Sequence, residues 1–282
     1  MGYARNRDNE YGNAVWEFFV FLERNNVREI KYMKNAHVVA YHQHLSNRNH
    51  FYKNKRLSAS TIYSQFNGIR LLFHHLVLSN KIDGIPSHVY KLKRPEMVNR
   101  QIVTQEEIKL MYAASDNYTE IALLCCAYGC GLRQSEILQL SIRDINLTNR
   151  TLLVRKGKFG KSRIVPLTKA IADYLKKYIH IIRSSYCKDN DKLFIHKNGR
   201  NISGMYLNKL IRKIIERTKD SLLREKHITL HCLRHSIATH MVDNGAGIDF
   251  VRQFLGHQDI NTTNRYAIQR KRNNQLLKKL FV

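Results

Sequence analysis

The sequence predicts a mainly α-helical protein with one small β-hairpin. Apolar residues recur at the three- and four-residue spacing of an α-helix through most of the 282 residues. Only two short runs, TLLVR at 151–155 and SRIVPL at 162–167, have the composition of β-strands. A basic segment with two of the three prolines interrupts the helical pattern after about 85 residues. Together these observations predict two domains, the second of which carries the hairpin.

The first domain is expected over 13–85 as a bundle of helices. Residues 1–12 are polar, and we expect them to be a flexible N-terminus. Two segments, 13–25 and 34–45, have apolar residues at helical spacing, and Ser60 is expected to open a longer amphipathic helix. The inner face of this longer helix would comprise Ile62, Phe66, Ile69, Leu72, Phe73, Leu76 and Val77.

The second domain is expected over 104–268, after a basic linker at 86–103 in which helical periodicity lapses. Thr104 is a suitable N-cap for its first helix, because Glu106 and Glu107 follow in the first turn. The β-like runs then give a hairpin with a basic tip. Further helices are predicted at 118–131, 132–145, 168–183 and 204–218.

Two short helices are expected next. Thr229 can cap the first, and Gly245 can end it. The second covers about 249–255 and stops at Gly256. In the first helix, the apolar residues recur at helical spacing: Leu230, Leu233, Ile237, Ala238, Met241 and Val242.

A third helix is expected to start at Asn261 and to carry Tyr266 one or two turns in. A basic tail helix follows at 269–282. Its apolar residues are Leu276, Leu277, Leu280 and Phe281. This clustering favours a contact between the tail and another protein over a fully solvated helix.

Charge is the strongest signal in the composition. Lys and Arg number 48 and Asp and Glu 22, which gives a net charge of +26 spread along the chain. A folded protein that repels itself this strongly is expected to have a polyanionic partner, and nucleic acid is the first candidate. An anionic membrane surface is less favoured, because the sequence has no basic amphipathic helix suited to it. A basic protein without such a partner is the remaining alternative.

Several features favour a cytoplasmic protein without membrane contact. No run approaches the roughly 18 apolar residues of a transmembrane helix. The N-terminus, MGYARNRDNE, lacks the apolar core of a signal peptide. The cysteines are odd in number and form no CxxC pair, which indicates reduced thiols that mostly fill the core. They are Cys125, Cys126, Cys130, Cys187 and Cys232.

Six polar residues of the second domain form a candidate catalytic set. They are Arg133, Lys158, His231, Arg234, His257 and Tyr266. His231 and Arg234 are three residues apart, so a helix places them on one face. Two guanidiniums can hold the nonbridging oxygens of a phosphate and stabilise the added charge of a phosphorane-like transition state.

The remaining members of the set fit roles in acid–base and nucleophilic catalysis. The Tyr266 phenol is a plausible nucleophile if a neighbouring group eases its deprotonation, and His231 fits the base. Lys158 fits a general acid that protonates a departing deoxyribose oxygen. His257 could donate a hydrogen bond to the phosphate. The arginines would supply the charge that Mg²⁺ supplies in other enzymes, so no metal or cofactor is expected.

Two assignments stay open. The general acid could be Lys156 or Lys161, which lie close to Lys158 in the hairpin. Arg133 taken alone could be an ion-pair partner of Glu136 at i,i+3, and we expect Glu136 to be a structural partner and not a catalyst.

Two further patterns imitate other sites. His231 and His235 have the spacing of a zinc motif, but Cys232 stands where that motif requires Glu. His235 and His240 are therefore expected to be structural. The run GKS at 160–162 imitates the end of a phosphate-binding P-loop, but the earlier glycine of that motif is missing.

The motifs GLRQSE, VRKGKFGKSRIVPL, HCLRH and LGH, with Tyr266 nine residues after His257, resemble the tyrosine recombinases. The resemblance covers nearly the whole chain and is strongest from Thr104 to Tyr266. The segment ASTIYSQFNGIRLLFHHLVLSNKI also resembles the helical, SAM-like core-binding domain of that family. All six candidate residues match the catalytic set of the family in type and order.

The resemblance implies a site-specific recombinase that cleaves and rejoins DNA through a covalent 3′-phosphotyrosine and a Holliday junction. It implies a C-shaped clamp of two domains around double-stranded DNA with short inverted-repeat sites. It further implies a homo-tetramer in which the tail contacts a neighbouring protomer, with an accessory DNA-bending protein or a partner recombinase as possible additions.

Two alternatives have different consequences. A nicking-closing enzyme like the type IB topoisomerases uses similar residues but acts alone, whereas the apolar tail favours an assembly. A non-catalytic DNA-binding protein would not depend on Tyr266. The sequence leaves integration, excision, inversion and dimer resolution open, because these outcomes depend on where the sites lie.

Overall fold

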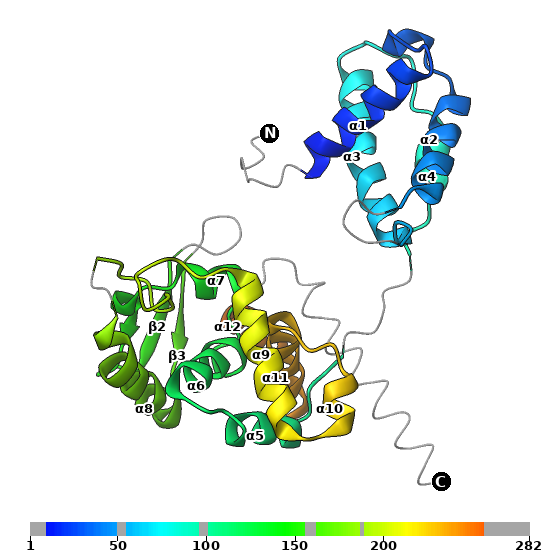
Figure 1. The fold of residues 1–282 in the computed structure, drawn as a ribbon. Coiled ribbons are helices and arrows are strands. Elements are labelled where there is room, and N and C mark those ends of the chain that lie inside the picture. The colour runs from blue at the N-terminus through cyan, green and yellow to red at the C-terminus, as the bar shows by residue number, and fades with distance from the viewer. Residues whose placement is uncertain (1–9, 50–54, 96–100, 156–161, 187–188, 257–282) are drawn as a thin grey trace. The chain divides into compact units, whose positions relative to one another are not determined.

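The computed structural model describes residues 10–49, 55–95, 101–155, 162–186 and 189–256 (Figure 1). The chain divides into two compact units, Met1–Val98 and Asn99–Val282, and each has its own hydrophobic core. As predicted, helices dominate, and the strands of the second unit form a small antiparallel sheet. Within these described ranges no helix is long and apolar enough to cross a lipid bilayer.

The first unit is built around aromatic side chains from three helices. Its elements are α1 (Glu10–Arg24), a 3-10 turn (Ile30–Tyr32), α2 (Asn35–Asn47), α3 (Ala59–Leu78) and α4 (His88–Lys91). The Phe18 ring of α1 meets the edges of Tyr41 of α2 and Phe73 of α3, with centroids 5.0 and 6.0 Å away. Gly68 lets α3 approach α1, because a Cβ there would lie 3.1 Å from the Tyr11 backbone.

The inner face predicted for the long helix is confirmed at Ile62, Phe66, Ile69 and Phe73, which are buried. Of the other predicted members, Leu72 and Leu76 are partly buried against the core, and Val77 is half-buried. Its predicted start is wrong. The helix begins at Ala59, and Ser58 is the cap, since its Oγ accepts a hydrogen bond from the Thr61 N–H at 3.2 Å. Ser58 has the extended backbone that an N-cap requires, whereas Ser60 already lies inside the helix.

Two further differences concern the ends of this unit. The first helix begins at Glu10, inside the segment expected to be a flexible N-terminus. The short helix α4 lies inside the segment expected to be a linker. It forms because Val89 is fully buried and because Arg70 donates hydrogen bonds to the Val89 and Leu92 carbonyls at 2.9 and 3.1 Å. These long-range contacts leave no periodic pattern in a segment this short.

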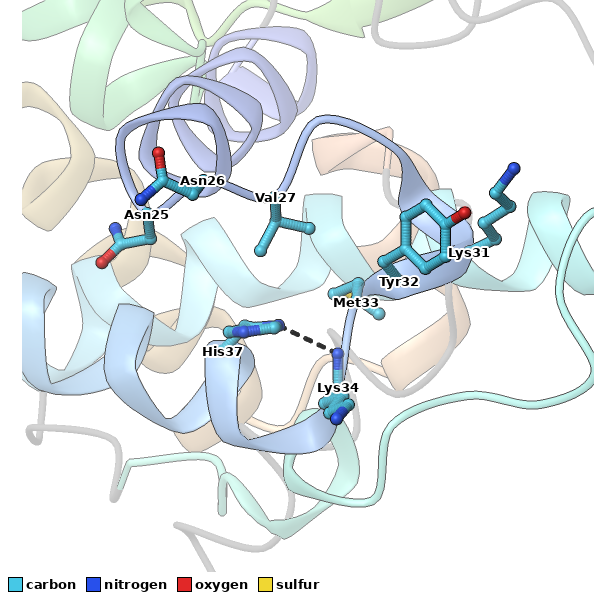
Figure 2. A pocket seen from close by; sticks show the side chains of 8 residues that line it. All are labelled: Asn25, Asn26, Val27, Lys31, Tyr32, Met33, Lys34 and His37. Carbon is cyan, nitrogen blue, oxygen red and sulfur yellow. Dashed lines mark hydrogen bonds between the residues drawn. The ribbon is translucent and has the colours of Figure 1, made fainter.

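A pocket lies between the end of α1 and the start of α2 (Figure 2). It is lined by Asn25, Asn26, Val27, Lys31, Tyr32, Met33, Lys34 and His37. His37 Nδ1 accepts a hydrogen bond from the Lys34 N–H at 3.0 Å, which closes the first turn of α2. The described residues that line this pocket all belong to the first unit.

The second unit places α6 between two groups of elements, with β2, β3 and α8 on one side and α9 and α11 on the other (Figure 1). Its first elements are α5 (Gln105–Ala113), α6 (Tyr118–Leu124) with a π-helical turn (Cys125–Gly129), α7 (Gln134–Gln139), a 3-10 turn (Ile142–Asp144), β1 (Ile145–Asn146), β2 (Thr151–Val154) and β3 (Arg163–Pro166). The later elements are α8 (Lys169–Lys177) with π-helical and 3-10 turns (Tyr178–Ile182, Arg183–Ser185), α9 (Gly204–Thr218), α10 (Ser221–Glu225), α11 (Leu230–Asp243) and α12 (Ile248–Leu255).

Local patterns predicted most of this unit. The capping box of α5 is confirmed, since Thr104 and Glu107 exchange hydrogen bonds at 2.8 and 3.2 Å. The hairpin is confirmed, with Leu152 opposite Val165. Cys125, Cys126 and Cys130 are buried, and burial raises the pKa of the Cys125 thiol to about 11.

The helix predicted at 132–145 is wrong in its second half. The helix α7 ends at Gln139, because Leu140 and Ile142 pair instead with the chain at 191–193. The Leu193 N–H donates to the Leu140 carbonyl at 2.7 Å, and the Ile142 N–H donates to the Asp191 carbonyl at 2.9 Å. The strand β1 and the helix α10 were not predicted.

We expect Ser58→Ala to lower the free energy of unfolding of the first unit by about 1 kcal/mol, because it removes the side-chain cap of α3. Ser60→Ala is the matched control and should change this free energy by less than about 0.5 kcal/mol. Urea unfolding can be followed by the fluorescence of Trp16, the single tryptophan, on α1. Equal effects of the two substitutions would contradict the assigned cap.

Candidate active site

The two predicted catalytic arginines, Arg133 and Arg234, lie close together in the second unit, although they belong to different helices. Arg133 is the N-cap residue of α7, directly after the turn at Gly131, where φ is +58°. Arg234 lies one turn into α11 and is buried, with 3% of its side chain exposed. Arg133 is more accessible, with 25% of its side chain exposed.

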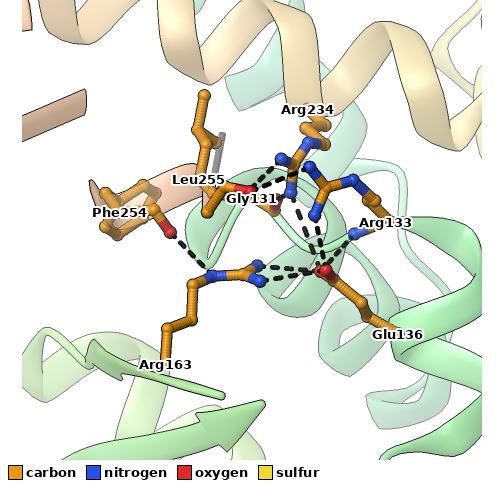
Figure 3. A network of polar contacts seen from close by, with 8 residues as sticks. Gly131, Arg133, Glu136, Arg163, Arg234, Phe254 and Leu255 are labelled. Carbon is orange, nitrogen blue, oxygen red and sulfur yellow. Dashed lines mark hydrogen bonds and ion pairs between the residues drawn. The ribbon is translucent and has the colours of Figure 1, made fainter. Parts of the chain in front are cut away.

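The carboxylate of Glu136 joins these arginines (Figure 3). Arg133 donates to it twice, from Nη1 at 2.7 Å and from its backbone N–H at 2.9 Å. Arg234 Nη1 lies 3.7 Å from Glu136 Oε2. The sequence predicts Glu136 as a structural partner of Arg133, and the structure adds Arg234 and a third arginine as partners.

The third arginine is Arg163, from β3. Its Nη1 and Nη2 donate to the two oxygens of Glu136 at 2.9 and 2.8 Å, a two-pronged contact (Figure 3). Sequence reasoning missed Arg163. A signal was present, because strand alternation puts residue 163 on the same face as the buried Val165, and a charged side chain on an inward face needs a partner.

The same three guanidiniums hold the end of α12. Arg163 Nε donates to the Phe254 carbonyl at 3.0 Å, Arg234 Nη2 to Leu255 at 2.5 Å and Arg133 Nη2 to Gly256 at 3.2 Å. Arg234 also donates to the Gly131 carbonyl. Positive side chains are favourable here, because the last carbonyls of a helix carry partial negative charge.

Gly256 ends α12 as predicted, in a left-handed conformation with φ of +66°. A Cβ at this position would lie 2.9 Å from Arg163 Nη1, so the glycine also makes room for the arginine. His257 follows directly in the sequence. The arginine cluster therefore holds Gly256, the residue that directly precedes His257 in the sequence.

Glu136 is ionised at neutral pH. Burial alone would raise its pKa, but the hydrogen bonds and charge of Arg163, the Arg133 N–H and the charge of Arg234 outweigh burial and lower the pKa to about 2. One carboxylate then faces three guanidiniums. The cluster of Arg133, Glu136, Arg163 and Arg234 is thus positive as a whole, which favours a bound anion such as a phosphate.

His231 lies in the first turn of α11, exposed, on the same helix as Arg234. Its Nε2 lies 3.0 Å from His235 Nε2, and the two rings meet edge to face. His240, on the same helix, is buried, and its Nδ1 lies 2.8 Å from the Tyr128 hydroxyl. Burial lowers the pKa of His240, which fits the structural role expected of it.

The other predicted site residues lie outside the described residues. They are Lys158 with its alternatives Lys156 and Lys161, His257 and Tyr266. The strands that precede and follow the lysines, Thr151–Val154 and Arg163–Pro166, are those predicted. The structure thus brings Arg133 and Arg234 together, adds Glu136 and Arg163, and carries His231 on the helix of Arg234.

Comparison with known proteins identifies the family of the chain. The model of the phage integrase family matches residues 101–273, more than half of the chain. The chain belongs to this family. It is a tyrosine recombinase.

The similarity to individual recombinases extends into the first unit. Tyrosine recombinase XerD of Staphylococcus saprophyticus is 30% identical over 94% of this chain and 88% of its own length. Tyrosine recombinase XerA of Pyrococcus horikoshii is 31% identical over 66% of this chain and 64% of its own length. The fold resembles a crystal structure of XerH site-specific recombinase bound to palindromic difH substrate, with a TM-score of 0.70. The two sequences are 22% identical, and the match covers 95% of this chain and 77% of the XerH chain.

The buried carboxylate makes a testable contribution to the stability of the recombinase. Glu136→Gln removes the charge but keeps the shape, and it should lower the free energy of unfolding of the second unit by roughly 3–5 kcal/mol, because three arginines lose their counter-charge. Its folded pKa lies at about 2, below the ordinary 4.5. The stabilisation should therefore be complete above about pH 4.5 and be lost as the pH falls towards 2.

Urea unfolding at several pH values would measure this difference. Glu225→Gln, at an exposed position of α10, is the matched control and should have little effect. A wild-type-like stability of Glu136→Gln at neutral pH would contradict the counter-charge role of Glu136.

Proposed function

We propose that this tyrosine recombinase exchanges DNA strands at specific sites through a covalent 3′-phosphotyrosine intermediate. The observation that carries the proposal is the convergence of Arg133 and Arg234 on one buried carboxylate, beside the end of α12. This positive cluster suits a phosphodiester, whose charge increases as the transition state forms.

In the proposed reaction, the Tyr266 oxygen attacks the phosphorus while His231 accepts the phenol proton. The bond from Tyr266 to phosphorus forms, and the bond from phosphorus to the 5′ oxygen breaks. Lys158 donates a proton to the departing oxygen, which leaves as a 5′-hydroxyl. The phosphate stays on the 3′ side of the break, joined to Tyr266.

The second step reverses the first on a different strand. A 5′-hydroxyl from the partner site attacks the phosphotyrosine, restores the phosphodiester and releases Tyr266. The number of phosphodiester bonds is unchanged, so the reaction needs no energy source and no oxidant. Arg133 and Arg234 would hold the nonbridging oxygens in both steps, with His257 as a further donor.

The partner is proposed to be double-stranded DNA with short inverted repeats. The net charge of +26 supports this, as does the fold shared with a recombinase whose crystal structure holds its DNA substrate. Two sites and two strands per site require four active sites, so we propose a homo-tetramer, with the tail at 269–282 as a contact between protomers. The first unit would be the core-binding domain, and the protein would act in the cytoplasm, where the bacterial chromosome lies.

The first test needs no knowledge of the target site. The wild type and Tyr266→Phe are expressed in the source cell, and the genomes are sequenced with long reads. New junctions at short inverted repeats should recur with the wild type and vanish with Tyr266→Phe, because Phe lacks the nucleophilic oxygen. Tyr174→Phe, at an exposed tyrosine of α8, is the matched control and should retain the junctions.

Junctions that persist in Tyr266→Phe would exclude Tyr266 as the nucleophile. If no junctions form, a supercoil relaxation assay separates the alternatives. Relaxation that requires Tyr266 would indicate a topoisomerase-like enzyme that acts alone, and DNA binding without relaxation would indicate a non-catalytic protein.

DNA binding should depend steeply on salt, because the net charge of the protein favours many phosphate contacts. For a protein that contacts about 6–10 phosphates, affinity should fall by about 10³–10⁵ between 50 and 200 mM salt. Fluorescence anisotropy with a labelled duplex would measure this, and glutamate salts at equal ionic strength would control for anion-specific effects. A flat plot of log affinity against log salt concentration would contradict binding through many phosphate contacts.

A further inference from the structure

The start of α11 is held by a side chain from another helix. Thr229 occupies the N-cap position, but its side chain makes no capping hydrogen bond, contrary to the sequence prediction. Its hydroxyl lies 3.4 Å from Cys232 Sγ instead. The N–H of Leu230, the first residue of α11, donates at 3.1 Å to Asn208 Oδ1, which belongs to α9.

The other end of the same amide contacts the helix of Arg133. Asn208 Nδ2 donates at 2.8 Å to Gln134 Oε1, and at 3.1 Å to the Gly204 carbonyl within α9. Gln134 is the first residue of α7 and follows Arg133 directly. Asn208 therefore connects the first residue of α7 with the first residue of α11.

Gly204 makes room for this connection. A Cβ at this position would lie 1.8 Å from Gln134 Nε2, so any other residue would displace the Gln134 side chain. The polar junction of Gln134, Gly204 and Asn208 thus depends on all three residues. It joins α7, α9 and α11, whose residues are far apart in the sequence.

We propose that Asn208 is a positioning residue for strand cleavage. Its amide sets the first turn of α11, which carries His231, relative to the first turn of α7, which Arg133 caps. Asn208 touches neither DNA nor the reacting atoms in this role. The inference rests on the proposed function, because it concerns the geometry of the proposed base and phosphate ligands.

The expected effect is on the rate of cleavage, since small displacements of a catalytic group can slow a reaction about 100-fold. Asn208→Ala removes all three hydrogen bonds of the side chain, including those to Gln134 and Leu230. Asn208→Asp keeps an oxygen for the Leu230 N–H, where negative charge is favourable at a helix N-terminus, but loses the donor to Gln134. Glu216→Gln, at an exposed position of α9, is the matched control.

Three measurements are made on the full-length protein. The rate of covalent complex formation is measured at saturating DNA on a nicked duplex that carries the target found by long-read sequencing. The affinity for the intact duplex is measured by anisotropy. Hydrogen–deuterium exchange of a peptide covering 226–234 reports on the first turn of α11 and does not require activity.

Asn208→Ala should cleave about 10- to 100-fold more slowly than the wild type, with site affinity unchanged within about threefold. Exchange in the 226–234 peptide should be faster than in the wild type. Asn208→Asp should restore the slow exchange, because the cap of α11 returns, but it should still cleave more slowly than the wild type, because the donor to Gln134 on α7 is lost.

Three results would overturn the proposal. They are Asn208→Ala cleavage within about threefold of the wild type, a loss of cleavage and affinity in equal measure, and wild-type cleavage by Asn208→Asp, which would show that the contact with Gln134 is not needed. If the wild type itself forms no covalent complex, the proposed function fails. Unchanged exchange in Asn208→Ala would then overturn the positioning role separately.

Discussion

The second unit depends on one buried carboxylate. Glu136 is 3% exposed and faces Arg133, Arg163 and Arg234, which come from α7, β3 and α11. Three guanidiniums cannot be brought this close in a low-dielectric region without a counter-charge, because their mutual repulsion adds to the cost of desolvation. The carboxylate offsets both and draws the three elements together, and the end of α12 supplies the remaining acceptors.

The ratio of one carboxylate to three guanidiniums also explains how a positively charged site can exist in a stable folded protein. A fully neutralised cluster would have no electrostatic preference for a phosphate, and an unbalanced one would oppose folding in a chain whose net charge is already +26. One ionised carboxylate and the partial charges of helix-terminal carbonyls offset part of the three positive charges. The remaining positive charge is what an incoming phosphate would neutralise.

Local sequence patterns predicted the elements whose formation is decided locally. The helices α5 and α12 follow from a capping box and a terminal glycine, and the hairpin follows from two β-like runs. The patterns did not predict α4, β1 or α10, which are short and depend on contacts with distant segments. The cap of α11 shows the same limit, since Thr229 has the right residue type but the Leu230 N–H donates instead to Asn208, 22 residues before it in the chain.

Sequence patterns likewise predicted only part of the candidate site. Arg133 and Arg234 could be chosen from their motifs, and the i,i+3 pairing of Arg133 with Glu136 follows from helix geometry. The contact between Arg163 and Glu136 spans 27 residues and no local rule predicts it. The roles of Lys158, His257 and Tyr266 remain predictions, because these residues lie outside the described part of the chain.

Arg133 and Arg234, which are proposed to bind one phosphate, differ in solvent exposure, so they are expected to contribute differently to DNA binding and to stability. Arg133, 25% exposed, presents part of its guanidinium to solvent while it holds Glu136. Arg234, 3% exposed, holds the Gly131 and Leu255 carbonyls, so it fixes the turn before α7 and the end of α12. A guanidinium has five N–H donors and can bind two carbonyls and a phosphate oxygen together. In the proposed reaction Arg133 would therefore provide the more direct contact for DNA, whereas Arg234 mainly holds the turn before α7 and the end of α12 in place.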